Sequence, residues 1–387
     1  MSLISDTAAL AAFVARQAGA RFVTVDTEFM RDRTFWPILC LVQVAGPEEA
    51  AVIDAMAPGI DLAPLYGLMV DPTILKVFHA ARQDIEIFFH QSGKIPTPIV
   101  DTQVAAMVCG FGDAVSYETL AGKLSGARID KSSRFTDWAH RPLTERQLQY
   151  ALSDVTHLRP AYEKLRRRIE KSGRADWVKE EMAVLTDPAT YRIAPREAWR
   201  RLKLRSDKPR FLAILREIAA WREEEAQRRD LPRGRILKDE SLIEIAAHAP
   251  ATVEDLARSR GLGRGFAEGR QGETLLAAIR RGAELPDSEC PRVPPRRDTP
   301  PGLGPIVDLM RVLLKMRCEA HEVATKLVAS AEDLEQIAAN DKAEVPALAG
   351  WRRELFGADA LALKNGRLAL TAAGRHIKIV ELPVAAQ

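Results

Sequence analysis

The stretch Phe22-Val23-Thr24-Val25-Asp26-Thr27-Glu28 decides how the N-terminal half of this chain folds. Its alternating apolar and polar residues, several of them β-branched, predict a strand that carries two acids at its end. Asp26 and Glu28 are two residues apart, so on extended chain their side chains project from the same face. Because two adjacent carboxylates repel one another, we expect a divalent cation to neutralise them.

A third acid lies in a later segment. Asp84 follows a short apolar run at 74–78 and precedes Ile85 and Phe88, whose spacing predicts a helix. The start of a helix carries partial positive charge, which favours a carboxylate there. The segment therefore predicts a strand, a turn and a helix that presents Asp84 near its first turn.

The helix expected over residues 144–171 presents a tyrosine beside a fourth acid. Tyr150 and Asp154 are four residues apart, which places both on one helix face about one turn apart. Thr144 is the predicted N-cap of this helix, and Gln147 stands three residues later in the position of a capping box. We therefore expect one helix to direct both side chains toward the same site.

Together these residues are typical of a divalent-metal site. Carboxylate oxygens suit Mg²⁺ or Mn²⁺, and two such ions about 4 Å apart can activate a water and stabilise the leaving oxygen of an in-line displacement. A tyrosine hydroxyl near a ligand can orient that water. No cysteine or second histidine accompanies the acids, which argues against zinc. Taken singly, each segment could instead be a solvated turn, a helix cap, or a packed tyrosine beside a surface acid.

The three segments resemble the three exonuclease motifs of the DEDD superfamily of 3′-to-5′ exonucleases. The tyrosine at position 150 places the chain in the tyrosine branch of that superfamily. The surrounding sequence is similar to the ribonuclease D family over the first ~190 residues. The stretches that carry this similarity are 26–31, 35–43, 79–84, 101–103, 130–134, 137–138 and 141–147.

The resemblance implies a ribonuclease H-like fold and a metal-dependent 3′-to-5′ exoribonuclease. Such enzymes release nucleoside 5′-monophosphates and trim the 3′ ends of tRNA precursors and other small structured RNAs. By the same resemblance, Tyr150 positions the attacking water, and two Mg²⁺ or Mn²⁺ ions are held by four acids. These metal ligands are Asp26, Glu28, Asp84 and Asp154. Four more residues lie in family-like segments without an assigned role, His79 being interpreted as a core histidine: Gln43, His79, Gln103 and Lys131.

Composition places the chain among ordinary globular proteins of two or three domains. It has 387 residues, 28% charged residues and a net charge of +3, so overall charge says little about nucleic acid. Its four cysteines show no paired spacing, which predicts neither a disulfide framework nor a zinc motif and suggests a reduced, cytoplasmic setting. The N-terminus lacks a signal-peptide pattern, and no apolar run approaches 18 residues. We expect a monomer with no obligate protein partner.

The expected fold class is α/β followed by all-α. Residues 1–195 should form the exonuclease domain, a mixed sheet with helices on its faces. Its strands are expected at 21–27, 38–45, 50–54 and 75–79, the second and third forming a hairpin. Its helices are expected at 6–18, 83–91, 101–109, 117–124 and 144–171.

The remainder is expected to be mainly helical, with short strand-like or helical ends at 366–370 and 377–382. Residues 207–285 resemble the helicase-and-RNase-D C-terminal (HRDC) domain, a small bundle associated with nucleic-acid binding. The proline-rich segment 286–305 predicts an extended linker. Residues 306–387 are interpreted as a second, diverged HRDC-like domain, because 323–338 echoes 231–246 at an offset of 92. Its role is open between RNA binding and packing.

Two further features of the sequence each allow two interpretations, and a third has one. The basic stretch 200–210 predicts either a solvated connector or a strip that contacts phosphates. The aromatic residues Trp36, Phe135 and Trp138 could stack on a base or pack in the core. The charged run 222–225 is interpreted as a solvated face.

Two other functions compete with the exoribonuclease. A 3′-to-5′ DNA exonuclease would have the same catalytic residues, because the sequence does not reveal contacts to the 2′-hydroxyl. A non-catalytic RNA-binding scaffold would be expected to lack a ligand or Tyr150, and all five residues are present. A metal-dependent RNA digestion would separate the three.

Overall fold

The computed structural model describes residues 2–133, 136–192, 194–204, 206–292, 300 and 302–383. The chain divides into two compact units. The first unit comprises Met1–Glu28, Cys40–Thr190 and Asp298–Gln387, and the second comprises Phe29–Leu39 and Tyr191–Arg297. No helix in the described ranges is both long and apolar enough to cross a membrane.

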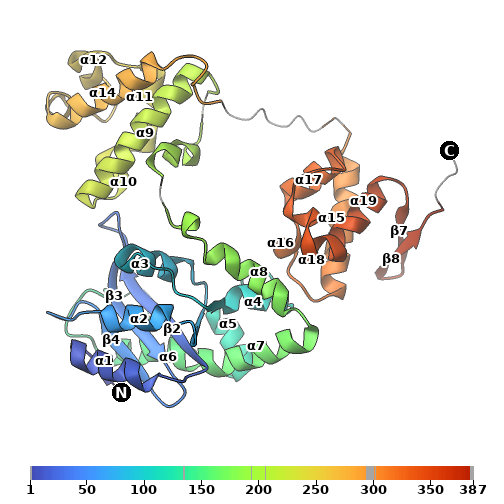
Figure 1. The fold of residues 1–387 in the computed structure, drawn as a ribbon. Helices are drawn as coiled ribbons and strands as arrows, with labels where there is room; N and C mark the ends of the chain where they lie inside the picture. The colour runs from blue at the N-terminus through green and yellow to red at the C-terminus, as the bar shows by residue number, and fades with distance from the viewer. Residues whose placement is uncertain are drawn as a thin grey trace. The chain divides into compact units, whose positions relative to one another are not determined.

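A six-stranded mixed sheet forms the centre of the α/β part (Figure 1). Its strands are β1 (Ser2–Ile4), β2 (Phe22–Met30), β3 (Ile38–Ala45), β4 (Ala50–Asp54), β5 (Leu75–Phe78) and β6 (Ile99–Asp101), in the order β1-β4-β3-β2-β5-β6. Strands β3 and β4 pair antiparallel, as the expected hairpin requires, whereas β2–β5 and β5–β6 pair parallel. The predicted mixed sheet is confirmed. The two strands that the sequence did not predict, β1 and β6, have only three residues each, too few to show an alternating pattern.

Eight α-helices accompany the sheet in the described part of residues 2–190. They are α1 (Thr7–Arg16), α2 (Ala63–Val70), α3 (Arg82–Ser92), α4 (Thr102–Val108), α5 (Tyr117–Ser125), α6 (Glu145–Thr156), α7 (Leu158–Ser172) and α8 (Ala175–Leu185). The single helix expected over 144–171 is in fact two helices, α6 and α7, separated at His157. Pro160 explains the break, because it lacks the N–H that would bond to the carbonyl of Thr156.

A buried lysine holds the strand β5 to its neighbouring loops. The side chain of Lys76 is fully buried, and its Nζ donates to the carbonyl oxygens of Asp71 at 2.7 Å, Ile74 at 2.8 Å and Thr97 at 2.6 Å. Three donors therefore meet three acceptors, which is the full hydrogen-bonding capacity of an ammonium group.

Replacing this lysine should weaken the fold. We expect Lys76→Met to lower the free energy of unfolding by about 3 kcal/mol, because each buried carbonyl left without a donor costs roughly 1–3 kcal/mol. Urea denaturation monitored by circular dichroism measures the change. Lys94→Met, at an exposed lysine of the same domain, is the control, and an equal effect of the two substitutions would contradict the assignment.

The second unit is built around one long helix. Its helices are α9 (Pro209–Arg229), α10 (Arg233–Ile236), α11 (Asp239–His248), α12 (Val253–Ala257), α13 (Arg264–Ala267) and α14 (Arg270–Glu284), preceded by the 3₁₀ helix Pro195–Arg201. Phe35 belongs to the apolar core of this unit, and the Arg233 guanidinium lies 4.5 Å from the centre of its ring. The backbone N–H of Trp36 donates to Asp230 Oδ1 at 3.0 Å. Residues 29–39 therefore pack with the helices in this unit.

The charged run 222–225 is only in part the solvated face that its composition predicts, because Glu224 is exposed whereas Arg222 and Glu223 are buried. Glu223 is fully buried and accepts two hydrogen bonds from Arg233, at 2.6 and 2.5 Å. Arg222 is also buried and donates to Asp239 Oδ1 at 2.6 Å and to the carbonyl of Leu237 at 2.9 Å. A buried charge is tolerated when it is paired in this way. The sequence interpretation was wrong for Arg222 and Glu223, because their partners lie 17 and 10 residues further along the chain.

The C-terminal segment belongs to the first unit. Its elements are α15 (Gly304–Ala320), α16 (Thr325–Val328), α17 (Ala331–Ala339), α18 (Gly350–Arg352), α19 (Ala358–Lys364), β7 (Leu368–Ala373) and β8 (His376–Glu381). The Trp351 ring stacks on Trp177 of α8, with centroids 4.2 Å apart and planes 11° apart. Arg352 pairs with both Glu180 and Glu181 of the same helix. These helices are therefore attached to α8 through a stacked aromatic pair and a charge cluster.

Candidate active site

Three of the predicted metal ligands come together in the structure. Asp26 and Glu28 lie on β2 and Asp154 on α6, and ligand oxygens of the three all lie within 4.8 Å of one another. The predicted capping box at the start of α6 is confirmed, with the Thr144 N–H donating to Gln147 Oε1 at 3.0 Å and the Gln147 N–H to Thr144 Oγ1 at 3.3 Å. The spacing of acids that the sequence suggested is thus realised by one strand and one capped helix.

Asp84, the fourth predicted ligand, is not part of that three-acid group. It lies buried in the first turn of α3, where its carboxyl group accepts a hydrogen bond from the hydroxyl of Thr27. Burial, and then the charge of Asp26, raise the pKa of Asp84 well above its ordinary value. Asp84 therefore contacts Thr27, the residue between Asp26 and Glu28, and its carboxyl group interacts electrostatically with that of Asp26.

The acids fit a divalent cation. Burial raises the pKa of Asp26 from 3.8 to about 6, against a smaller lowering by the backbone N–H of Thr27. Carboxylates that resist ionisation in each other's presence become stable ligands once a cation supplies the opposite charge. The group offers only oxygen atoms, which suits Mg²⁺ or Mn²⁺ better than zinc or copper.

Tyr150 stands beside these acids. Its hydroxyl is hydrogen-bonded to the side chain of Asp154, one helical turn away. Burial, followed by the charges of Asp154, Glu28 and Asp26, raises the pKa of Tyr150 far above its ordinary value. The phenol therefore stays neutral, so it can orient a water or a substrate oxygen but cannot act as a base at physiological pH.

A cavity of about 370 Å³ opens beside the acids. Asp26, Tyr150 and Asp154 form one part of its wall, and residues of α5 and the loop before it form another. Its further polar lining residues are His79, Gln103, Ser116, Tyr117 and Glu118. Its volume falls in the range of a small-ligand site, large enough for one nucleotide unit.

The cavity wall contains residues that the sequence did not suggest. Tyr117 donates through its hydroxyl to the carbonyl of Ser153 at 2.9 Å, and burial raises its pKa far above the ordinary value. Nothing local in the sequence marks Tyr117 or Glu118, because they reach the site only when α5 packs near α6. Gln103, which had no predicted role, and His79, which was interpreted as a core histidine, also line the cavity. Burial lowers the pKa of His79, whose Nδ1 lies 2.9 Å from Thr102 Oγ1.

The remaining candidate residues lie elsewhere. Trp138 is 3% exposed and packs at 6.0 Å from the Tyr150 ring, so core packing explains it and base stacking does not. Gln43 is buried in β3 and is not among the residues that line the cavity. The side chain of Lys131 and all of Arg134, Phe135 and Arg205 lie outside the described residues.

Comparison with known proteins gives two family matches. A 3′-5′ exonuclease model matches residues 1–170, and an HRDC domain model matches residues 211–279. The chain is 55% identical to ribonuclease D of Granulibacter bethesdensis over 380 residues, which are 98% of this chain and 96% of that protein. It is 53% identical to ribonuclease D of Nitrobacter hamburgensis over 380 residues, covering 98% of this chain and 99% of that one.

A solved structure agrees with these relatives. The crystal structure of Escherichia coli RNase D, an exoribonuclease involved in structured RNA processing, matches with a TM-score of 0.79 and 30% identity. The match covers 94% of this chain and 98% of that one. The catalytic core of RRP6 from Trypanosoma brucei, at 18% identity and a TM-score of 0.53, shares the fold.

Proposed function

This chain belongs to the ribonuclease D family, which makes it a 3′-to-5′ exoribonuclease, and we propose that it holds divalent cations through the four acids of its exonuclease domain. The proposed ligands are Asp26, Glu28, Asp84 and Asp154. The proposal rests on one observation: carboxylate oxygens of Asp26, Glu28 and Asp154 all lie within 4.8 Å of one another.

The cations, Tyr150 and the cavity would each have a different role in the reaction. When bound, two Mg²⁺ or Mn²⁺ ions would supply an activated water and stabilise the oxygen that leaves the phosphorus. The neutral Tyr150 hydroxyl, anchored to Asp154, orients that water for attack on the terminal phosphodiester. The cavity beside the acids receives the 3′-terminal nucleotide, which departs as a nucleoside 5′-monophosphate.

The proposed substrates are the 3′ ends of tRNA precursors and other small structured RNAs. The protein is proposed to act on them as a monomer in the cytoplasm. The relation to an Escherichia coli enzyme of structured RNA processing supports this substrate class. The cytoplasmic setting is supported by four cysteines that are all free and buried.

The domain organisation is part of the proposal: an exonuclease domain at 1–195, an HRDC-like domain at 207–285, a linker at 286–305 and a diverged HRDC-like domain at 306–387. The order of elements supports the diverged copy, because both segments begin with a long helix followed by a four-residue helix. Helix α16 (Thr325–Val328) lies 92 residues after α10 (Arg233–Ile236), and α17 begins at Ala331, 92 residues after Asp239 begins α11. This spacing is the offset seen in the sequence.

Digestion of labelled RNA tests the function. A 3′-extended tRNA precursor and a matched single-stranded DNA, each labelled at the 5′ end, are incubated with Mg²⁺, with Mn²⁺ or with EDTA. We expect a metal-dependent ladder that shortens the RNA by one nucleotide at a time while the DNA is spared. Preferential shortening of DNA would support the DNA exonuclease instead, and no cleavage with either metal would support a binding scaffold.

A further inference from the structure

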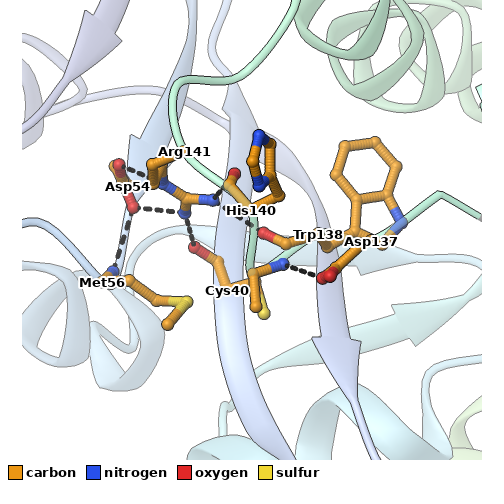
Figure 2. Close-up of polar contacts among 8 residues, drawn as sticks. Cys40, Asp54, Met56, Asp137, Trp138, His140 and Arg141 are labelled. Carbon is orange, nitrogen blue, oxygen red and sulfur yellow. Dashed lines mark hydrogen bonds and ion pairs between the residues drawn. The ribbon is translucent and has the colours of Figure 1, made fainter.

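The side chain of Arg141 uses every hydrogen-bond donor that it has (Figure 2). Its Nε and Nη2 donate to the two carboxylate oxygens of Asp54, at 2.8 and 2.6 Å. Nη1 donates to the carbonyls of Trp138 at 2.7 Å and His140 at 2.9 Å, and Nη2 also donates to the carbonyl of Cys40 at 3.2 Å. Five N–H donors thus meet five acceptors, in the fork geometry that only arginine offers.

These contacts fasten the loop before α6 to the sheet. Asp54 ends β4 and Cys40 lies in β3, whereas Trp138 and His140 belong to the loop that leads into α6. The Asp54 carboxylate is itself held, because it also accepts from the backbone N–H of Met56 at 3.0 Å. Arg141 therefore joins two strands and one loop at a single guanidinium group, as Figure 2 shows.

The loop held in this way packs against the tyrosine of the site. The Trp138 ring is almost fully buried, and its centroid lies 6.0 Å from that of Tyr150, with planes tilted by 30°. A second link ties the same loop to the start of α6, where Gln147 Nε2 donates to Thr136 Oγ1 at 3.2 Å. The Tyr150 ring thus lies beside a residue whose own carbonyl accepts a hydrogen bond from Arg141.

We propose that Arg141 is a positioning residue, which acts through Trp138 to hold the Tyr150 hydroxyl in line for the attacking water. The inference rests on the function proposed above for Tyr150. Arg141 is not among the described residues that line the cavity, so an effect on turnover has to pass through the residues that it holds. Substrate affinity, which depends on the cavity wall and the acids, is left nearly unchanged.

A double-mutant cycle tests the proposal. Arg141→Lys keeps the positive charge but cannot form the two-pronged pair with Asp54. Because small misplacements of a catalytic group slow reactions strongly, we expect kcat for 5′-labelled RNA to fall by about tenfold, with KM within about twofold. In a Tyr150→Phe background, where there is no hydroxyl to position, the same substitution should change kcat by less than about twofold.

The matched control is Arg16→Lys. Arg16 also forms a two-pronged pair, with Glu49 at 2.7 and 3.0 Å, but on the outer part of the same domain. Its substitution should leave kcat unchanged in both backgrounds. If the unfolding temperature of Arg141→Lys falls below the assay temperature, Trp138→Phe is carried through the same cycle and must show the same dependence on Tyr150.

The outcomes separate the two proposals. Equal losses from Arg141→Lys with and without the Tyr150 hydroxyl would show that Arg141 only supports the fold, and the positioning role would be wrong while the proposed function stands. A Tyr150→Phe enzyme as fast as the unmodified one would remove the role of Tyr150 and this inference with it. An unmodified enzyme that leaves RNA intact would contradict the proposed function itself.

Discussion

The Asp154→Asn substitution is expected to lower kcat on RNA by about 10³-fold while RNA binding persists. Asp154 is buried, belongs to the three-acid group and bonds to the Tyr150 hydroxyl, so the substitution disturbs a proposed metal ligand and the orientation of the tyrosine together. A divalent ion contributes several kcal/mol to the transition state, and a loss of about 4 kcal/mol corresponds to this factor. Asn has the shape of Asp, so the fold of α6 should be retained.

The measurement pairs single-turnover digestion with fluorescence anisotropy of labelled RNA in EDTA. Asp26→Asn should behave in the same way, since Asp26 belongs to the same group. Glu145→Gln serves as the control, because it removes an exposed acid from the same helix. If Asp154→Asn abolished binding as completely as hydrolysis, these acids would have a structural role or would contact RNA directly.

Removal of divalent cations should stop hydrolysis completely, and the stabilisation that cations confer should depend on pH. Burial raises the pKa of Asp26 from 3.8 to about 6 in the folded chain without metal. This carboxyl group lowers stability as pH rises from 3.8 to about 6, because over that interval the unfolded chain ionises while the folded chain keeps the proton. Below about pH 6 a cation must displace this proton in order to bind, so its stabilising effect should be smaller near pH 5 than near pH 8.

Thermal unfolding with Mn²⁺ or with EDTA, at about pH 5 and about pH 8, measures this difference. A ligand present at 100 times its Kd stabilises the folded state by about 2.7 kcal/mol, and this sets the scale of the shift expected at the higher pH. The Asp154→Asn variant should lose most of the shift. Equal stabilisation at both pH values would indicate that the cation binds without displacing protons from the buried acids.

The elements that carry the site could be predicted because their signals are local. An alternating strand at 22–28 and a capping box at Thr144 and Gln147 involve residues two to four positions apart, and the structure contains both. Strands of three residues, such as β1 and β6, give no such pattern because their stability comes from pairing with neighbours. The break between α6 and α7 had a local cause in Pro160, but the apolar pattern of the helix continued across it.

Buried charges were the least predictable feature. Arg222 and Glu223 look like a solvated run in the sequence, and Arg141 looks like one residue of a family-like segment. Each is buried or half-buried because a partner from another element, Asp239, Arg233 or Asp54, neutralises it. The pairing distance in space is below 3 Å in every case, whereas the separation along the chain ranges from 10 to 87 residues.

The proposed site was therefore already indicated by the sequence, as four acids and a tyrosine of which two pairs have spacings that a strand and a helix convert into shared faces. Residue spacing predicts direction, because backbone geometry repeats every two or 3.6 residues. The distance between segments follows no such rule. Folding alone brought Asp154 beside Asp26, placed Tyr117 and His79 in one cavity wall, and set the Trp138 ring beside that of Tyr150. Those neighbours follow from the packing of whole elements on the sheet, which minimises exposed apolar surface and pairs buried charges such as those of Arg222 and Glu223.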